Sequence, residues 1–410
     1  MHYDAIIVGA GAAGLFASIQ ISESGKSVLL LEHNKIVGKK LLITGKGRCN
    51  LTNNCTSDEV LKNIPTNPKF MFGALNRFTP QDTIDFFENK LGIKLKTERG
   101  NRVFPVSDKA SEIVDALERK AKSNGVQIRF EKVTGIISQN STVSGVSCSG
   151  KAYYSEKVIV ATGGKSYSGT GSTGDGYEFA KQQGHTVTRL VPSLVPVVSD
   201  DGFCAQMMGL SLKNVTLLLI DKSSGKIIFS ELGEMLFTHF GVSGPLVLSA
   251  SSHIRSMEDK RYYFSIDLKP GLSEEQLDAR ILRDFSESQN KFFENSLNKL
   301  LPSKMIPVII KLSGIPAEIK VNQITKAQRA ELVKLIKNFC INIKSFRPLD
   351  EAIITCGGID TREISPKSME SKLVKGLYFI GEILDVDAYT GGYNLQIAFS
   401  TAFAASSDII

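Results

Sequence analysis

The sequence predicts an α/β protein in which one parallel-sheet domain is assembled from both ends of the chain around an inserted middle part. Residues 4–14 (DAIIVGAGAAG) read as a buried strand followed by a Gly-x-Gly-x-x-Gly turn. Residues 376–382 (GLYFIGE) repeat an apolar strand followed by glycine and an acid near the other end. Between residues 191 and 347 the pattern changes to antiparallel strands and then to helices.

The N-terminal segment predicts a complete β-α-β unit. An apolar strand at 5–8 leads through the turn into a helix at 15–24, and a second strand at 28–31 ends at Glu32. In such a turn, backbone amides at the helix N-terminus bind a pyrophosphate. Glu32 lies 18 positions after Gly14, close to the spacing at which an acid binds ribose hydroxyls. The unit therefore predicts a dinucleotide without a 2′-phosphate.

The C-terminal segment favours a flavin over a nicotinamide. Gly391-Gly392 precedes an apolar stretch at 395–405 that reads as a closing helix, whose free amides could face a flavin ring. One dinucleotide held by both ends of the chain accounts for both segments. An NAD-dependent dehydrogenase that uses the first turn alone leaves residues 376–394 unexplained.

The middle of the chain predicts two inserted parts. Strands are expected at 215–221, 226–229, 234–238 and 261–267, and capping boxes at Ser273 and Thr325 begin helices. We therefore predict a nucleotide-binding domain at 1–190 and 348–410, a β-rich insert at 191–272 and a basic helical insert at 273–347.

The charge of the chain is concentrated in the helical insert. The whole chain carries a net charge of +7, and residues 291–347 contain eleven Lys or Arg against three Glu, a net charge of +8. Solvated helix faces are the simplest interpretation, and with no recognised nucleic-acid module we expect no nucleic-acid partner. A flavoprotein that binds a polyanion through this block is the alternative.

The composition limits which classes of protein and which cellular compartments remain possible. No apolar run is long enough to span a bilayer, and the first residues form a nucleotide-binding strand, so we expect neither a membrane anchor nor a signal peptide. Six cysteines without C-x-x-C spacing favour a reducing cytoplasm. The five His and the acids show no metal-ligand spacing, so no metal is expected.

Four further features have competing interpretations. Cations at 39–48 could face the pyrophosphate or the flavin, or could form a solvated loop. A second glycine match at 169–174 favours a flexible loop lining the active site over a nicotinamide site. Cys49 is expected to be buried and inert. His239 is a weak candidate for acid–base catalysis.

These residues together resemble the BaiN/YhiN-like flavoproteins, the aminoacetone oxidase family of FAD-binding enzymes. The resemblance lies in residues 9–14 with Glu32, 39–53 (KKLLITGKGRCNLTN), 161–176 (ATGGKSYSGTGSTGDG), 233–245 and 369–396. It implies a discontinuous Rossmann-like FAD-binding domain of the glutathione-reductase type, with an inserted β-barrel-like subdomain and a small helical subdomain.

The resemblance also implies the cofactor contacts. They are Gly9, Gly11, Ala13, Gly14, Glu32, Lys40, Arg48, Asn50, Thr162, Gly163, Gly381, Glu382, Gly392, Asn394 and Leu395, with Val133 where such proteins pass a backbone amide to the adenine. Ala388 stands where the family tends to have glycine, so Ala388 and Tyr389 are expected to alter the substrate face, and Tyr389 is a second weak catalytic candidate.

The function implied is that of an FAD-dependent oxidoreductase acting on a small molecule. Hydride moves to or from flavin N5. Members of the family resemble oxidases of amino-ketones or amines in some cases and reductases of unsaturated steroid-type acids in others. The electron partner is therefore either oxygen or a transiently bound NADH or NADPH.

Overall fold

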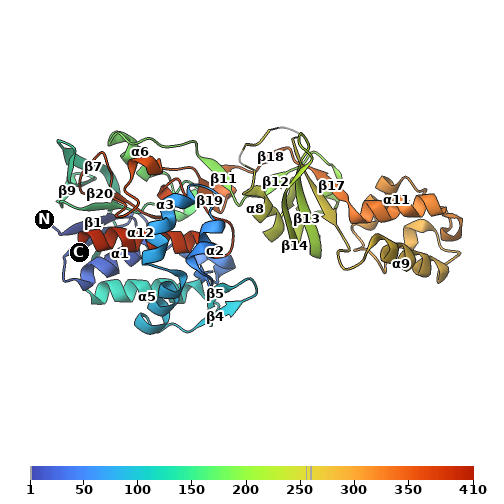
Figure 1. Ribbon diagram of the computed structural model, residues 1–410, viewed down its shortest axis with the longest axis horizontal. Coiled ribbons are helices and arrows are strands. Elements are labelled where there is room, and N and C mark those ends of the chain that lie inside the picture. The colour runs from blue at the N-terminus through green and yellow to red at the C-terminus, as the bar shows by residue number, and fades with distance from the viewer. Residues whose placement is uncertain (1, 255, 259–260) are drawn as a thin grey trace. The chain divides into compact units, whose positions relative to one another are not determined.

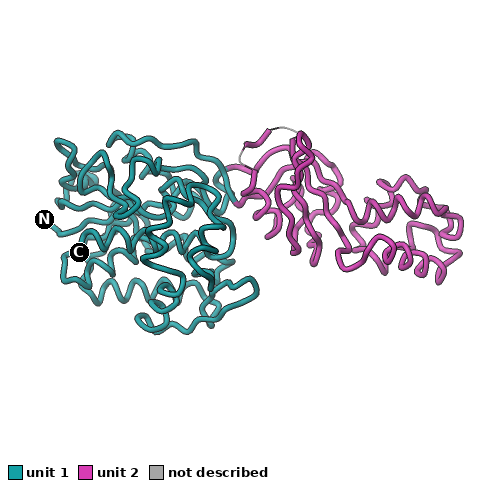
Figure 2. Tube along the Cα trace, in the orientation of Figure 1, with its two compact units in different colours: residues 1–193, 349–410 teal, residues 194–348 magenta. Residues whose placement is uncertain are grey.

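The computed structural model describes residues 2–254, 256–258 and 261–410 and divides the chain into two compact units (Figures 1 and 2). Unit 1 comprises residues 1–193 and 349–410, and unit 2 comprises residues 194–348. The observed division falls within three residues of each end of the predicted insert. Both chain ends belong to unit 1.

A five-stranded parallel sheet forms the centre of unit 1. Its strand order is β20 (Leu377–Phe379), β10 (Val158–Val160), β1 (Ala5–Val8), β2 (Val28–Leu31) and β6 (Gln127–Arg129). Every residue of the first four of these strands is buried, as expected for parallel strands covered on both faces. The predicted Rossmann-type α/β fold is confirmed, and the C-terminal strand lies two places from the N-terminal one.

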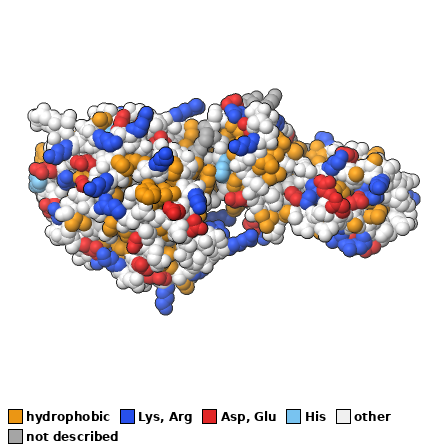
Figure 3. All heavy atoms as spheres, in the orientation of Figure 1, with side chains coloured by type: hydrophobic (Ala, Val, Ile, Leu, Met, Phe, Trp, Pro, Cys, Tyr) orange, Lys and Arg blue, Asp and Glu red, His pale blue; other side chains and the backbone are white. Residues whose placement is uncertain are grey.

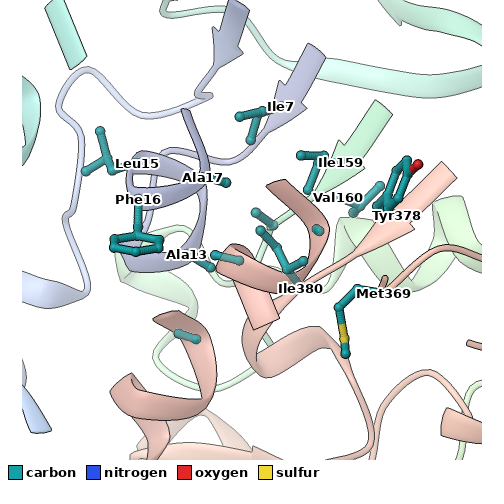
Figure 4. Close-up of a cluster of buried hydrophobic side chains, with 14 of the residues drawn as sticks. Ile7, Ala13, Leu15, Phe16, Ala17, Ile159, Val160, Met369, Tyr378 and Ile380 are labelled. Carbon is teal, nitrogen blue, oxygen red and sulfur yellow. The ribbon is translucent and has the colours of Figure 1, made fainter. Parts of the chain in front are cut away.

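Helices from both chain ends pack against each other beside this sheet. Helix α1 (Ala12–Glu23) contacts α12 (Tyr393–Ile409) and α5 (Ala110–Ser123). The Phe16 and Phe399 rings lie 5.5 Å apart between α1 and α12. Figure 4 shows Ala13 of α1 close to Ile380, which follows β20. The shorter helices of unit 1 are α2 (Ser57–Lys62), α3 (Pro68–Arg77), α4 (Pro80–Asp85) and α6 (Asp175–Gln182).

Three small antiparallel sheets complete unit 1. The first joins β3 (Thr52–Asn53), β5 (Arg102–Pro105) and β4 (Leu95–Glu98). The second joins β7 (Val133–Gln139), β8 (Thr142–Cys148) and β9 (Lys151–Tyr154). The third pairs β11 (Val191–Ser193) with β19 (Ile354–Cys356), so the segments on either side of unit 2 are joined within unit 1.

Unit 2 contains a seven-stranded antiparallel sheet that curves back on itself. Its order is β17 (Phe339–Asn342), β16 (Tyr262–Asp267), β13 (Ser211–Asp221), β14 (Lys226–Thr238), β15 (Gly241–Ser243), β12 (Val197–Val198) and β18 (Ser345–Phe346). The edge strands β17 and β18 are separated by only two residues. Two residues span less than 10 Å or so, so the two edges are close together, as in a barrel.

One strand prediction in unit 2 is wrong. Residues 226–229 and 234–238 were expected to form separate strands, but they belong to the single strand β14. The antiparallel partner β13 pairs with β14 on both sides of the expected break, through Ser230, Glu231, Leu232 and Gly233. Pairing along the whole length of β13 keeps this polar, glycine-containing stretch extended.

The helical part of unit 2 shares one hydrophobic core with the sheet. Its helices are α7 (Phe203–Gln206), α8 (Pro245–Ser251), α9 (Glu274–Ser286), α10 (Ile306–Ser313) and α11 (Lys326–Lys337). Both predicted capping boxes are present, at Ser273 and Thr325. The Leu268 N–H donates to the Ile336 carbonyl at 3.0 Å, and the core continues from the sheet into the helices. Among the described residues, no helix is long and apolar enough to cross a membrane.

Gln396 provides a test of how α12 is fixed in unit 1. Its buried amide oxygen accepts from the Thr52 and Thr83 hydroxyls at 2.6 and 2.8 Å, and its nitrogen donates to the Phe78 carbonyl at 3.1 Å. Gln396→Leu keeps the volume but removes these bonds. We expect a loss of roughly 2–4 kcal/mol and a melting midpoint roughly 5–10 °C lower by circular dichroism. An equal loss in the control Gln81→Leu, at an exposed position of α4, would contradict this reading.

Candidate cofactor and active site

The carboxyl ends of four parallel strands meet at one edge of the central sheet. Strand β1 leads into Gly9, β2 into Glu32, β10 into Thr162 and β20 into Gly381. Because these strands are parallel neighbours, their following residues lie on the same edge, where open α/β sheets bind ligands. The structure thus brings together site residues from both ends of the sequence.

The first glycine turn is shaped by internal contacts at two positions and is open at the third. A Cβ atom on Gly14 would lie 1.9 Å from the Gly9 oxygen, and one on Gly9 would lie 2.5 Å from the Ala161 oxygen. A Cβ on Gly11 would meet nothing within 4 Å. Gly11 caps α1 without a side-chain hydrogen bond, so the first N–H groups of the helix face an open surface suited to an anion.

The Glu32 carboxylate lies directly beside this turn. Its Oε2 atom accepts from the Ala10 N–H at 2.9 Å, and its Oε1 atom accepts from the backbone and side-chain nitrogens of Asn34 at 2.8 and 2.7 Å. These bonds hold a buried acid next to the helix N-terminus. A carboxylate in this position can accept further hydrogen bonds from ribose hydroxyls.

The second glycine loop packs against the same part of the site. The Asn34 side-chain nitrogen lies 3.3 Å from the Thr170 carbonyl, and a Cβ on Gly171 would lie 2.3 Å from that nitrogen. Asn34 therefore connects the loop to Glu32. No sequence signal had marked Asn34 as a site residue.

An ion pair joins the loop after β2 to the end of β20. Lys40 Nζ lies 2.8 Å from Glu382 Oε2 and donates to Ser166 Oγ at 2.9 Å. Glu382 Oε1 also accepts from the Thr355 N–H at 3.0 Å. Lys40 and Glu382, both predicted site residues, are half-buried and bound to each other across 342 positions of sequence.

Two buried hydroxyl groups near this pair lack a partner among the described residues. They are Thr162 Oγ1 and the Tyr177 phenol. Gly176 leaves room for Thr162, because a Cβ there would lie 2.1 Å from Thr162 Oγ1. Burial raises the pKa of Tyr177, so the phenol keeps its proton. Buried hydroxyls normally have a hydrogen-bond partner, so these two unpaired groups, one of them next to Gly163 with its φ of +73°, mark this part of the site as incomplete without a bound group.

The turn before α12 is built around Gly392. A Cβ on Gly392, which has a φ of +97°, would lie 2.3 Å from the Thr52 oxygen. The Asn50 amide lies 3.0 Å from the Gly392 nitrogen and 3.1 Å from the Thr52 oxygen. Asn394 accepts from the Ala388 N–H at 2.9 Å and donates to its carbonyl at 2.8 Å. Asn50 and Asn394 therefore shape the backbone of the turn.

Two more predicted residues, Gly381 and Leu395, contact or belong to helix α12. Gly381 donates its N–H to Thr401 Oγ1 at 3.0 Å, and a Cβ on Gly381 would lie 3.2 Å from the Ala13 Cβ. This contact places the ends of α1 and β20 against each other. Leu395 is partly buried and packs on the core of unit 1.

The Arg48 guanidinium is bound by other side chains of unit 1. It forms ion pairs with Glu98 and with Asp108, the latter at 2.6 Å, and its guanidinium lies 4.2 Å from the centre of the Phe104 ring. Arg48 holds the pKa of Glu98 below its ordinary value. The arrangement anchors the 41–48 loop on strand β5.

The remaining predicted residues lie at separate places. Val133 is buried in β7 opposite Cys148. Cys49 is fully buried, and burial raises its pKa to about 12, which makes its thiol unreactive at neutral pH. His239 is exposed between β14 and β15 of unit 2. Tyr389 is half-buried near the Gly392 turn and donates its backbone N–H to the Asn63 carbonyl at 3.0 Å.

Asn53 is a further residue that the sequence did not mark. Its side-chain nitrogen donates to the carbonyls of Gly100 and Gly391, each at 3.0 Å. The amide thus connects the turn of the β4–β5 hairpin to the turn before α12. Within the described residues, no three His, Cys, Asp or Glu side chains are grouped to hold a metal ion.

Comparison with known proteins gives matches along the whole chain. Residues 3–408 match the family described as "HI0933-like protein Rossmann domain". The chain is 33% identical over 409 residues to the ribosomal RNA dihydrouridine synthase of Escherichia coli K12, covering 100% of this chain and 98% of the relative. It is 35% identical to the enzyme of the same name from Haemophilus influenzae, covering 98% of each.

A relative with a different named activity has similar identity. The chain is 31% identical over 407 residues to the 3-dehydro-bile acid delta(4,6)-reductase of Clostridium scindens, covering 97% of each. Among solved structures, the 3-ketosteroid delta1-dehydrogenase of Sterolibacterium denitrificans superposes with a TM-score of 0.54 at 12% identity, covering 100% of this chain and 99% of that one. At this identity the structural likeness shows the fold alone.

The place of Glu32 in the site leads to a prediction for cofactor binding. Glu32→Gln removes the negative charge beside the open helix N-terminus, where the sequence predicts that an acid accepts hydrogen bonds from ribose hydroxyls. We expect FAD to bind about 10–100-fold more weakly, because one charge-assisted hydrogen bond contributes about 1.5–3 kcal/mol. Fluorescence titration of the apoprotein measures this. Glu118→Gln, at an α5 acid paired with Lys122, is the matched control, and an equal effect there would count against the assignment.

Proposed function

The chain belongs to the HI0933-like Rossmann family of FAD-dependent oxidoreductases, and on that premise we propose that it reduces the C5=C6 double bond of uridine in ribosomal RNA. The family assignment confirms the resemblance inferred from the sequence motifs. The substrate, the electron donor and the roles of individual residues are parts of the proposal.

The observation that carries the proposal is a chemistry shared by the named relatives. Uridine has its C5=C6 bond conjugated to the C4 carbonyl, and a 3-oxo steroid with Δ4,6 unsaturation has its double bonds conjugated to the C3 carbonyl. Both reductions add hydride to an electrophilic carbon of a double bond conjugated with a carbonyl group, the β-carbon of the enone or the δ-carbon of the dienone, and a proton to another carbon of the conjugated system. Relatives of nearly full length carry both activities in their names, at 31–35% identity.

The site residues fit FAD, with the pyrophosphate at the Gly11 end of α1 and the ribose at Glu32. When bound, the cofactor supplies the hydride chemistry that side chains lack. In the proposed site, the N-terminal end of α12 has no side-chain cap at Gly392, and its helix dipole would stabilise negative charge on the ring system. The Lys40–Glu382 pair fixes the loop after β2 against the segment that follows β20.

Proton delivery is assigned to Tyr389. Its place beside the Gly392 turn puts a phenol on the loop that precedes α12, and Asn394 fixes the neighbouring backbone through Ala388. His239, which is exposed on unit 2, is not assigned a role in this proposal. We assign NADH or NADPH as the electron donor that regenerates the reduced cofactor. The proposal places the protein in the cytoplasm, in keeping with six free cysteines.

A conjugated keto steroid is the second candidate substrate, favoured by the Clostridium scindens relative. To separate the two, the purified flavoprotein is reduced anaerobically with NADH or NADPH while flavin absorbance is followed. It is then mixed with protein-free ribosomal RNA or with a 3-oxo-Δ4,6 steroid acid. We expect RNA to reoxidise the flavin and one uridine to gain two hydrogen atoms by mass spectrometry. Reoxidation by the steroid alone supports the second candidate, and reoxidation by air alone contradicts both.

The assignment of Tyr389 has its own test. In Tyr389→Phe the hydroxyl that donates the proton is absent, while the ring remains. We expect kcat for substrate reduction to fall about 10²–10⁴-fold, with FAD content and flavin reduction by the donor unchanged. Rapid-mixing absorbance separates the two half-reactions. Tyr154→Phe, at an exposed position of β9, is the control, and a Tyr389→Phe enzyme with normal substrate reduction would remove this residue from the mechanism.

A further inference from the structure

Unit 1 contains a strongly basic surface region that was not apparent from the overall charge distribution. It is formed by residues 35–48 and 94–109, which we call the basic rim. The two segments contain ten Lys or Arg and only two acids, Glu98 and Asp108, a net charge of +8. They are separated by 45 residues in sequence, so neither resembles a charged block by itself.

Both acids of the basic rim are bound by two of its own cations. Glu98 and Asp108 each pair with Arg48 and Lys96. The other exposed cations have no acidic partner among the described residues. They are Lys35, Lys46, Lys94, Arg99, Arg102 and Lys109. The rim therefore has a positive charge that the protein itself does not neutralise.

Direct contacts hold the two segments together at the cofactor site. The Arg48 guanidinium lies over the Phe104 ring of β5, and a Cβ on Gly45 would lie 3.2 Å from this ring. At the tip of the β4–β5 hairpin, the Gly100 carbonyl shares the Asn53 amide with Gly391. The exposed Arg99 and Arg102 on either side of Gly100 are thus fixed beside the turn before α12.

The basic block of unit 2 is different. Among the described residues, at least five of its eleven cations form ion pairs, and four of these pairs use acids outside the block, which the charge count over 291–347 omits. The pairs are Lys299–Glu287, Arg329–Asp278, Lys337–Asp267, Lys344–Asp200 and Lys334–Glu331. Figure 3 shows red and blue side chains interspersed over the part of unit 2 that carries α9 and α11. This part of the chain offers a polyanion a weaker field than its sequence indicates.

We propose that the basic rim of unit 1, with Arg99 and Arg102 at its centre, binds the RNA backbone next to the target nucleotide. This inference rests on the proposed function and adds where the substrate is held. Uncompensated cations beside a cofactor edge favour a ligand with several phosphates, because each phosphate that is neutralised releases counterions. A neutral ring ligand would gain nothing from them. The Asn53 link keeps the bound strand in register with the site.

Salt-dependent binding of a defined RNA tests this surface. The probe is a fluorescein-labelled uridine 20-mer, and its affinity for the FAD-loaded protein is measured by anisotropy between 0.05 and 0.3 M salt, on the order of physiological values. Arg99→Gln with Arg102→Gln removes two phosphate contacts. We expect the slope of log K against log salt to fall by about 1.4 and binding at about 0.1 M salt to weaken about 25-fold. FAD content and melting temperature report that the variant is folded.

The matched control is Lys311→Gln with Lys320→Gln, two exposed cations of the unit 2 block without an acidic partner among the described residues. We expect the control to bind RNA like the wild type. If the control loses RNA affinity and the Arg99/Arg102 variant does not, the proposal that the basic rim binds RNA is wrong, while the proposed function stands. Wild-type protein that binds no RNA at the lowest salt, yet reduces the steroid acid, overturns both.

Discussion

The site depends on one close approach, that of helix α1 to strand β1. No side-chain atom fits between them, because a Cβ on Gly14 would lie 1.9 Å from the Gly9 oxygen. This contact directs the free N–H groups of α1 toward the carboxyl edge of the sheet. Ala13 then contacts Gly381 at the end of β20, so the geometry at the start of the chain also fixes where its last strand ends.

Long-range polar bonds turn this edge into a single site. The Lys40–Glu382 pair and the Gln396 hydrogen bonds to Thr52 and Thr83 each join segments separated by more than 300 residues. Such bonds are short-range and directional, so they fix loops that the sheet alone would leave free. A cofactor that contacts both chain ends would in turn stabilise the folded state, since it binds only when they are assembled.

The sequence predicted the parts of this site that local rules determine. Buried strands, glycine turns and capping boxes are encoded by neighbouring residues, and the structure contains them. Features that depend on contacts between residues far apart in the sequence could not be predicted from the sequence. Strand β14 continues through Gly233 because β13 pairs with it, and Arg48 is bound by acids 50 and 60 positions away. Asn34 and Asn53 act through contacts with remote carbonyls, which no spacing rule identifies.

The distribution of charge shows most clearly what could not be predicted from the sequence. A count over residues 291–347 indicates a strongly basic patch, yet acids such as Asp267 and Asp278 lie just outside this window and pair with its cations. The net charges of residues 35–48 and 94–109 are modest separately. In the folded chain the two segments meet around Phe104, and their two acids pair with their own cations. The field that a ligand meets depends on which charges remain after pairing. Ion pairing therefore lowers the unneutralised positive charge of residues 291–347, whereas residues 35–48 and 94–109 keep most of theirs.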